Sequence, residues 1–265
     1  MRVVSLACSN TEILAALGLG HLLVGVDDDS DHPAQLLADL PRVGRDLDVD
    51  ADAVAALSPD LVLASLTVPG HDKVVARLAD KGLNMLVLAP KSVSDTLRSI
   101  RLIGGALGVP ERAESVCAEV EAGLVPLAGW QQGPKVLVEW WPRPCIAAGR
   151  RSWVNQMLAA AGARNAAESL DVESQPLTDA QVVELAPDAV VISWCGVPVD
   201  KYRPEVVLRR TGWSAVPAVV NGHVVPISEE ERKKLRVTVN GLMAKGRRLL
   251  GFAKYDMTRQ DCEDA

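Results

Sequence analysis

Short runs of aliphatic and β-branched residues recur along the chain and predict strands. Most are followed by segments with apolar residues at helical spacing, such as Thr11–Leu17, which ends at Gly18, and Val74–Lys81, which stops at Gly82. Strands that alternate with helices predict parallel sheets built from βαβ units. The predicted strands are Val3–Leu6, Leu22–Val26, Leu61–Ala64, Met85–Leu88, Val136–Glu139, Ala189–Ser193 and His223–Ile227.

The first half of the chain recurs in the second half. The segment Ala56–Ala64, with its Ser-Pro-Asp turn before an apolar run, corresponds to Glu184–Ile192, with Ala-Pro-Asp at the same place. Two further pairs follow in the same order: Arg2–Leu6 with Lys135–Glu139, and Ile13–Gly18 with Gln156–Gly162. Matches in register predict two related lobes.

Long helical patterns separate the two halves. Val93–Leu107 and Glu111–Leu127 are interrupted at Pro110, which suits the first turn of a new helix and cannot continue the old one. We interpret Glu111–Trp130 as a rigid helix between the lobes. The predicted fold is α/β: two Rossmann-like lobes with parallel sheets, joined by a long helix, with a ligand cleft between them. The predicted boundaries are 1–109, 110–133, 134–254 and a flexible tail at 255–265.

Composition narrows the class of partner and the compartment. The chain has 265 residues, is 48% hydrophobic and carries a formal net charge of −6, which disfavours nucleic acid. No apolar stretch is long enough to insert into a membrane. Five scattered Cys and the strand-like start at Met1–Leu6 predict a cytoplasmic protein as written, or a periplasmic or other extracytoplasmic one if a leader has been removed.

Known catalytic motifs are missing from the sequence. It contains no phosphate-binding glycine loop, no HExxH and no GxSxG, and its four His lie singly. We therefore predict no catalytic residue and no metal site.

An acidic loop follows the second predicted strand. Asp27–Pro33 holds four carboxylates and one imidazole, at the end of a strand where α/β sheets bind ligands. The spacing does not match a calcium loop. A solvated turn that caps the next helix is the alternative interpretation.

Tryptophan marks the ends of two strands in the second half. Trp140 and Trp141 precede Pro142, and Trp194 ends the strand Ala189–Ser193. Neighbouring residues on a strand face opposite ways, so one of the pair is expected to be exposed, and an exposed indole suits stacking on a flat, mostly apolar ligand. One Trp in the core and the other over a loop is the alternative. Trp130, Trp153 and Trp213 are expected to be structural.

Two further groups adjoin the expected ligand cleft. Cys145 and Cys195 lie in predicted cleft loops, where inert buried thiols are the favoured interpretation and metal ligation the alternative. Glu229–Lys234 opens the last helix, with acids before bases, as a helix dipole favours. Glu231 and Arg232 are expected to reach amide groups of a ligand from there.

With these motifs the chain resembles the substrate-binding proteins of cobalamin and ferric-siderophore ABC importers, the class with a rigid helix between its lobes. The resemblance runs from about Arg2 to about Lys254. Its landmarks are Ser9–Leu14, Val24–Val26 with Ser30–Pro33, Leu57–Val62, Ser152–Leu158 and the Trp-Trp-Pro-Arg-Pro and Ser-Trp-Cys-Gly segments.

The resemblance implies a ligand held by the loops after the strands and a permease that docks on acidic residues. The implied ligand contacts are Asp29, Leu66, Thr67, Trp140, Trp141, Arg143, Trp194, Glu231 and Arg232. The implied docking residues are Asp72, Asp200 and Glu205. Asp29 and Leu66 stand where aromatic residues occur in the family, so a ligand would lack an aromatic partner from the first lobe.

The leading hypothesis is a monomeric, non-catalytic protein that binds a cobalamin-type corrinoid. A ferric-siderophore or haem-binding protein is the alternative, with Arg143 and Arg232 pairing with carboxylates. A cytosolic corrinoid chaperone or enzyme, with Cys145 or Cys195 at the metal, is the third.

Overall fold

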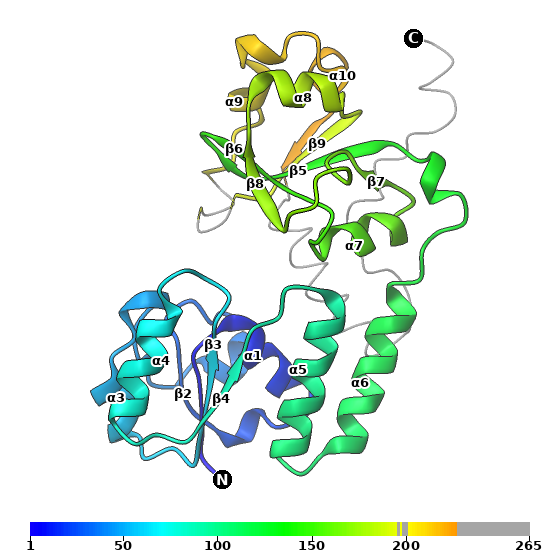
Figure 1. Ribbon diagram of the computed structural model, residues 1–265. Coiled ribbons are helices and arrows are strands. Elements are labelled where there is room, and N and C mark those ends of the chain that lie inside the picture. Colours follow the sequence, from blue (N-terminus) through cyan, green and yellow to red (C-terminus); the bar gives the residue numbers. More distant parts are fainter. Residues whose placement is uncertain (195–196, 198–200, 227–265) are drawn as a thin grey trace. The chain divides into compact units, whose positions relative to one another are not determined.

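The computed structural model describes residues 1–194, 197 and 201–226, and the chain forms two compact units. Unit 1 is Met1–Ala118 and unit 2 begins at Glu119. Figure 1 shows helices and strands mixed in both, so the predicted α/β class is confirmed.

Unit 1 contains one parallel sheet. Its strands are β1 (Val3–Ser5), β2 (Leu23–Val26), β3 (Leu61–Ser65) and β4 (Met85–Leu88), in the order β2-β1-β3-β4. Each lies within about one residue of its predicted range.

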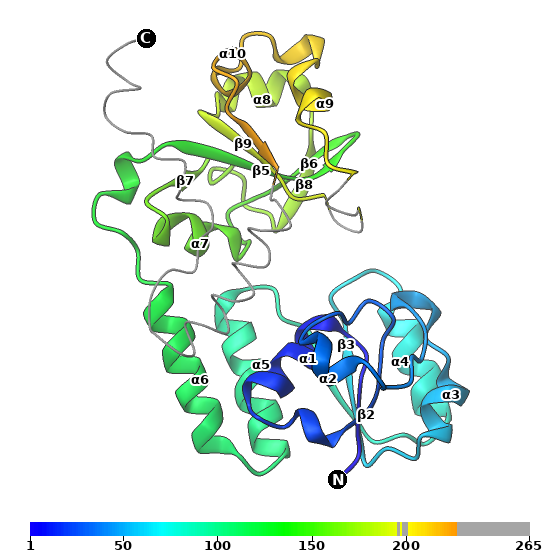
Figure 2. The same ribbon diagram turned by 180° about the vertical axis from the view of Figure 1, so that it is seen from behind.

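Helices cover both faces of this sheet, as its apolar strands require. Val54 of α3 and Val74 and Leu78 of α4 pack with Val4 and Val62 of the sheet. Figures 1 and 2 show α1 and α5 on the opposite face. The helices of unit 1 are α1 (Cys8–Ala16), α2 (Ala34–Leu37), α3 (Ala51–Ala56), α4 (His71–Asp80) and α5 (Val93–Ala106), with short 3-10 turns η1 (Gly20–Leu22) and η2 (Asp46–Asp48).

The helix between the halves is shorter than expected. It is α6, Pro110–Gly123, and it begins at Pro110 as the sequence predicts. The prediction that it continues to Trp130 was wrong. Pro126 lacks the N–H that a helix interior needs, and Gly129 adopts a left-handed conformation with φ of 80°.

Unit 2 contains a six-stranded mixed sheet. The path is β10-β9-β5-β6-β8, and β7 also pairs with β5. The predicted strands β5 (Lys135–Pro142), β9 (Ala189–Ile192) and β10 (Val224–Pro226) run parallel. Three strands were not predicted. β6 (Cys145–Ala148) is antiparallel to both of its neighbours, β5 and β8 (Ser174–Leu177), and the two-residue β7 (Arg164–Asn165) is parallel to β5.

The two faces of this sheet carry separate cores. Leu137 packs with residues of α8, α9 and α10, whereas Val136 and Val138 pack with α7. Figures 1 and 2 show α8 and α10 on one side of the sheet and α7 on the other. The helices are α7 (Val154–Ala160), α8 (Asp179–Leu185), α9 (Pro204–Leu208) and α10 (Pro217–Val220), with 3-10 turns η3 (Trp130–Gln132) and η5 (Thr211–Trp213).

The internal repeat has a structural counterpart in hydrogen bonds. The carboxylate of Asp60 accepts the backbone N–H of Arg2 at 2.6 Å, and Asp188 accepts that of Lys135 at 2.7 Å. The Arg2 side chain donates to the carbonyl of Leu57, and Lys135 donates to that of Leu185. In each unit, therefore, the start of the first strand is bonded both to the Pro-Asp turn and to the end of the helix that precedes this turn.

Candidate ligand-binding site

The two adjacent tryptophans of β5 lie at a register irregularity, because Glu139 pairs with Ala147 of β6 and Trp141 pairs with Ile146. Trp140 lies on the α7 side and stacks on Trp153, with ring centroids 5.9 Å apart and planes inclined by 25°. The side chain of Trp141 is 41% exposed, as expected for one of the pair. The stacked rings form an apolar surface, which we call the tryptophan shelf (Trp140 and Trp153).

Trp153, which was expected to be structural, stacks on Trp140 but is 42% exposed. It stands at the end of a tight turn before α7. The Asn155 amide donates to the carbonyls of Gly149 and Ser152, and the Ser152 hydroxyl accepts the N–H of Val154. These bonds hold the turn so that the Trp153 ring lies outward over Trp140. Trp213, in contrast, is fully buried as expected.

Trp194 is buried, against the expectation of an exposed ring beside Trp140. It is 6% exposed, and its indole N–H donates to Glu139 at 2.8 Å. Tyr202 contacts its ring edge-on at 5.5 Å and donates its hydroxyl to the Trp194 carbonyl. Trp194 belongs to the core that contains Leu137, on the other face from Trp140. It therefore does not extend the tryptophan shelf.

A buried ion pair explains why Trp194 is held inside. Glu139, at the end of β5, is fully buried, and both its carboxylate oxygens accept hydrogen bonds from Arg210. Arg210 also donates to the carbonyl of Pro142 at 2.8 Å and lies 4.3 Å from the ring centre of Trp213. This pair was not predicted from the sequence, because its partners are 71 residues apart.

The thiol of Cys145 is buried beside this pair. Burial raises its pKa far above the ordinary range of a thiol, and the nearby Glu139 carboxylate raises it further. Cys145 is thus a protonated core residue, in agreement with the inert interpretation. Cys195 lies outside the described residues.

In unit 1 the acidic loop after β2 is internally bonded. Asp27 is buried, and its carboxylate accepts the Ser30 hydroxyl and the N–H of Asp29. The Asp29 carboxylate pairs with Arg45 at 2.7 Å. Asp29 is therefore already balanced by a cation of its own unit.

The loop after β3 presents apolar and hydroxyl groups. Leu66 is 40% exposed, and the Thr67 hydroxyl lies 2.9 Å from that of Ser65. The N–H of Val68 donates to Nδ1 of His71, whose Nε2 then donates to Asp46 at 2.6 Å. This buried histidine fixes the end of the loop.

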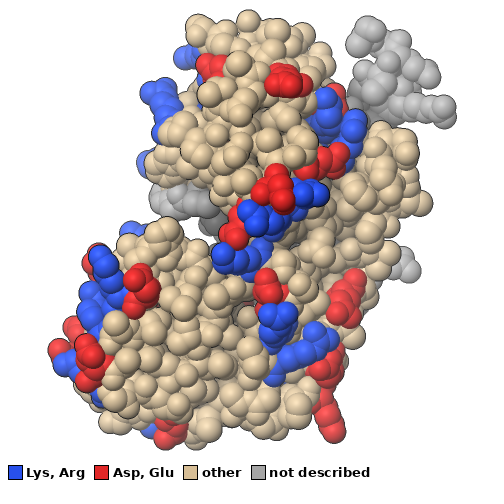
Figure 3. Space-filling model, in the orientation of Figure 1, with Lys and Arg blue, Asp and Glu red and all other residues tan. Residues whose placement is uncertain are grey.

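The remaining expected residues divide between exposed positions and undescribed segments. Asp72 lies exposed in the first turn of α4, and Glu205 in the first turn of α9. Asp200, Glu231 and Arg232 lie outside the described residues. Figure 3 shows acidic and basic side chains next to one another on the visible face of unit 1. Ion pairs of unit 1 include Asp29–Arg45 and Asp52–Lys81.

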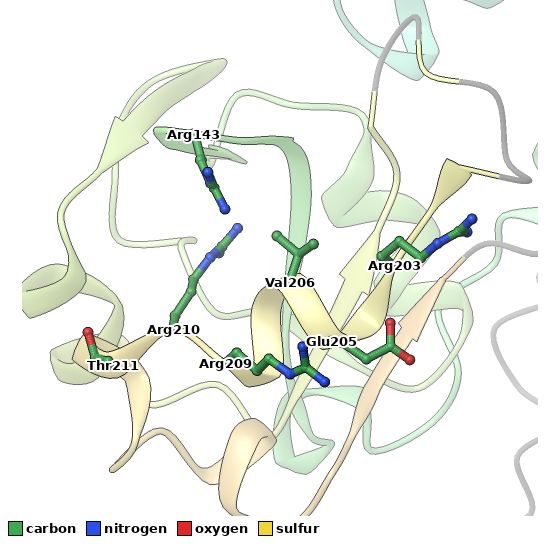
Figure 4. A pocket seen from close by; sticks show the side chains of 7 residues that line it. All are labelled: Arg143, Arg203, Glu205, Val206, Arg209, Arg210 and Thr211. Carbon is green, nitrogen blue, oxygen red and sulfur yellow. The ribbon is translucent and has the colours of Figure 1, made fainter.

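A cationic hollow of about 580 Å³ lies on unit 2. Four of its lining residues are arginines, and Figure 4 shows the side chains of Arg143 and Arg210 directed toward one another. Its lining residues are Arg143, Arg203, Glu205, Val206, Arg209, Arg210 and Thr211. Among described residues no cluster of three or more His, Cys, Asp or Glu has the geometry to hold a metal ion. The helices within the described ranges are too short or too polar to cross a membrane.

Residues 3–231 match the family model described as "Periplasmic binding protein". The chain is 31% identical over 238 residues to the ABC transporter substrate-binding lipoprotein YvrC of Bacillus subtilis, covering 86% of this chain and 73% of that protein. It is 25% identical over 196 residues to a vitamin B12-binding protein of Pectobacterium carotovorum, covering 72% of this chain and 70% of that one.

Solved structures of the same architecture include the periplasmic heme-binding protein RhuT from Roseiflexus. It is 26% identical to this chain, with a TM-score of 0.69, over 91% of this chain and 98% of that one. The resemblance drawn from the sequence motifs is therefore confirmed at the level of the family.

Proposed function

The chain belongs to the periplasmic binding protein family, and on this premise we propose that it is the substrate-binding protein of an ABC importer, with a cobalamin-type corrinoid as its ligand. In this role it binds the ligand and releases it unchanged to a permease. We place it outside the cytoplasm, because its relatives include a substrate-binding lipoprotein.

The observation that carries the ligand proposal is the tryptophan shelf. Trp153 is 42% exposed although it is one of the most apolar side chains, and Trp140 stacks on it at 5.9 Å. Exposed aromatic surface that a turn holds in place is typical of a binding site for a large, flat ligand. A relative named as a vitamin B12-binding protein supports the corrinoid.

Two potential metal donors of unit 2 lie on the other face of the sheet from the shelf, and their state favours a ligand that brings its own metal ligands. Haem iron in proteins is held by His, Cys, Met or Tyr. The hydroxyl of Tyr202 donates to the Trp194 carbonyl, and the thiol of Cys145 is buried with a raised pKa. Neither group is available as an anionic donor in this arrangement.

Haem is the second candidate, and the cationic hollow is the observation that favours it. Haem carries two carboxylates, and arginine pairs with carboxylates through two parallel hydrogen bonds. The heme-binding protein RhuT shares the architecture at 26% identity. A ferric siderophore with carboxylate groups fits the same hollow by the same chemistry.

We also propose roles for residues outside the tryptophan shelf. We propose Leu66 and Thr67 as ligand contacts of unit 1, and the exposed carboxylates of Asp72 and Glu205 as contacts of the permease. Asp29 is a weaker ligand contact, since Arg45 occupies its carboxylate. We expect the protein to act as a monomer.

The experiment that tests the ligand is equilibrium binding of four compounds to the full chain, followed by tryptophan fluorescence. The compounds are cyanocobalamin, cobinamide, haemin and one ferric siderophore. We expect micromolar or tighter binding of the corrinoids. Binding of haemin or the siderophore without corrinoid binding would select the second candidate, and binding of none would remove both.

A further inference from the structure

Two guanidinium groups converge on the cationic hollow of unit 2. Arg143 lies in the turn between β5 and β6, and Arg210 follows α9. Figure 4 shows the two side chains pointing toward one another across the hollow, whereas Arg203 points away from them.

Buried contacts with Glu139 and Trp213 fix the position of Arg210. Its side chain is only 14% exposed, both oxygens of Glu139 accept from it, and it lies over Trp213. Guanidinium has five N–H donors. Three of them are directed to Glu139 and the Pro142 carbonyl, so two remain for a group in the hollow.

The charge of Arg143 is not balanced in the same way. Arg143 is exposed and makes no hydrogen bond or ion pair with the part of the chain that the structure describes. The Glu139 carboxylate compensates Arg210 alone. Like charges that converge repel one another unless an anion lies between them. The hollow therefore has an excess of positive charge and donors directed inward.

We propose that this hollow is an oxyanion subsite, which binds a phosphate or carboxylate group between Arg143 and Arg210. Each guanidinium would donate to an oxygen of the anion, the geometry that arginine favours with both groups. The subsite rests on the convergence of the two arginines, independently of the tryptophan shelf. Its anion is either free in solution or part of the transported ligand.

Arg143 is the residue to change, because replacing Arg210 would leave Glu139 buried without its cation. We compare the unchanged chain with Arg143→Gln and with the matched control Arg203→Gln, which removes one arginine from the same hollow. Inorganic phosphate is titrated calorimetrically at constant ionic strength, against chloride. Circular dichroism checks that each variant is folded.

We expect saturable phosphate binding that Arg143→Gln weakens about tenfold or more, as the loss of a charge-assisted hydrogen bond implies. Arg203→Gln should change it by less than about threefold, because a distant exposed charge is screened. The subsite would be overturned by the lack of saturable phosphate binding, or by equal losses in the two variants, which would indicate a general surface potential.

A second titration identifies the source of the anion. Cyanocobalamin carries a phosphodiester in its nucleotide loop, and cobinamide lacks it. If the ligand supplies the anion, Arg143→Gln should reduce the preference for cyanocobalamin about tenfold. An unchanged preference, with phosphate binding lost, supports a subsite for a free anion. If no corrinoid binds, the proposed ligand fails while the phosphate titration still decides the subsite.

Discussion

Arg210 holds the fully buried carboxylate of Glu139 through both of its oxygens. The pair joins the end of β5 to the segment after α9, and Trp194 donates to the same carboxylate. The buried Glu139 carboxylate therefore needs the Arg210 cation, and the stability of this part of unit 2 depends on the pair.

We expect Arg210→Met to destabilise unit 2 by about 3–5 kcal/mol, because it leaves a buried carboxylate without its cation. Urea unfolding followed by circular dichroism measures the change. The control is Arg150→Met, which breaks the exposed pair with Asp171 and should cost less than about 1 kcal/mol. Replacing Glu139 by Leu as well should recover part of the loss. Equal effects of Arg210→Met and Arg150→Met would contradict this account.

Stability should depend on pH through the first turn of α5. The Ser92 hydroxyl donates to Asp95 at 2.8 Å and accepts its backbone N–H, and this bonding lowers the pKa of the Asp95 carboxyl. A lowered pKa adds stability above the unfolded value of about 3.9, and that stability is lost as pH falls through the folded pKa. We therefore expect Asp95→Asn to cost about 0.5–1 kcal/mol near neutral pH and less near pH 2, where more of the carboxyl is protonated. Urea unfolding at both pH values checks this, and a cost that is the same at both would argue against it.

The thiol of Cys8 should resist alkylation in the folded protein. Burial, and then the Asp27 carboxylate, raise its pKa to about 12. Only about one thiol in ten thousand is then ionised at pH 8, far fewer than for a free Cys with a pKa of about 8.5. Iodoacetamide labelling, read by mass spectrometry of the Cys8 peptide, should be slow in the native chain and fast in urea. Equally fast labelling in both would refute the raised pKa.

The state of the Cys145 thiol distinguishes a binding protein from a corrinoid chaperone that uses this residue as a metal ligand. Because this thiol is buried and its pKa is raised, it does not supply a thiolate to cobalt. We expect Cys145→Ser to leave the absorption spectrum of bound corrinoid unchanged. A thiol-dependent band that disappears in this variant would support the chaperone instead.

The repeated pattern made the organisation of the chain predictable. Pro59-Asp60 and Pro187-Asp188 each precede an apolar strand, and in both units the aspartate accepts a backbone N–H at the start of the first strand. The signal is local, because a turn, a helix end and a buried strand lie within a few residues of one another. Such patterns identify elements reliably.

The antiparallel strands of unit 2 carry no comparable signal. β6 is Cys145–Ala148, with one β-branched residue, and β8 is Ser174–Leu177, which contains Pro176. Proline is tolerated in β8 because this strand lies at the edge of the sheet, where its missing N–H costs least. The extended conformation of these two segments comes from pairing with neighbouring strands rather than from their own sequence.

The candidate site was predictable in part. The adjacency of Trp140 and Trp141 predicts that one of them is exposed, and Trp141 is 41% exposed. The burial of Trp194 depends on Glu139 and Arg210, which are far apart in sequence, and the exposure of Trp153 depends on the turn that Asn155 closes. Both outcomes follow from long-range or turn-specific contacts, which hydrophobic patterns do not contain.

The most direct test of the proposed function is the affinity for cyanocobalamin of the unchanged chain, of Trp153→Ala and of the control Trp130→Ala. Trp130 is partly exposed in η3, which precedes the start of β5 at Lys135, whereas Trp140 lies near the other end of that strand. Equilibrium dialysis gives the affinities independently of the tryptophan signal. We predict that Trp153→Ala weakens binding about tenfold or more, the loss of a stacked aromatic contact of about 1.5 kcal/mol, and that Trp130→Ala leaves it unchanged. Unaltered affinity in a folded Trp153→Ala protein would contradict the tryptophan shelf as the ligand surface.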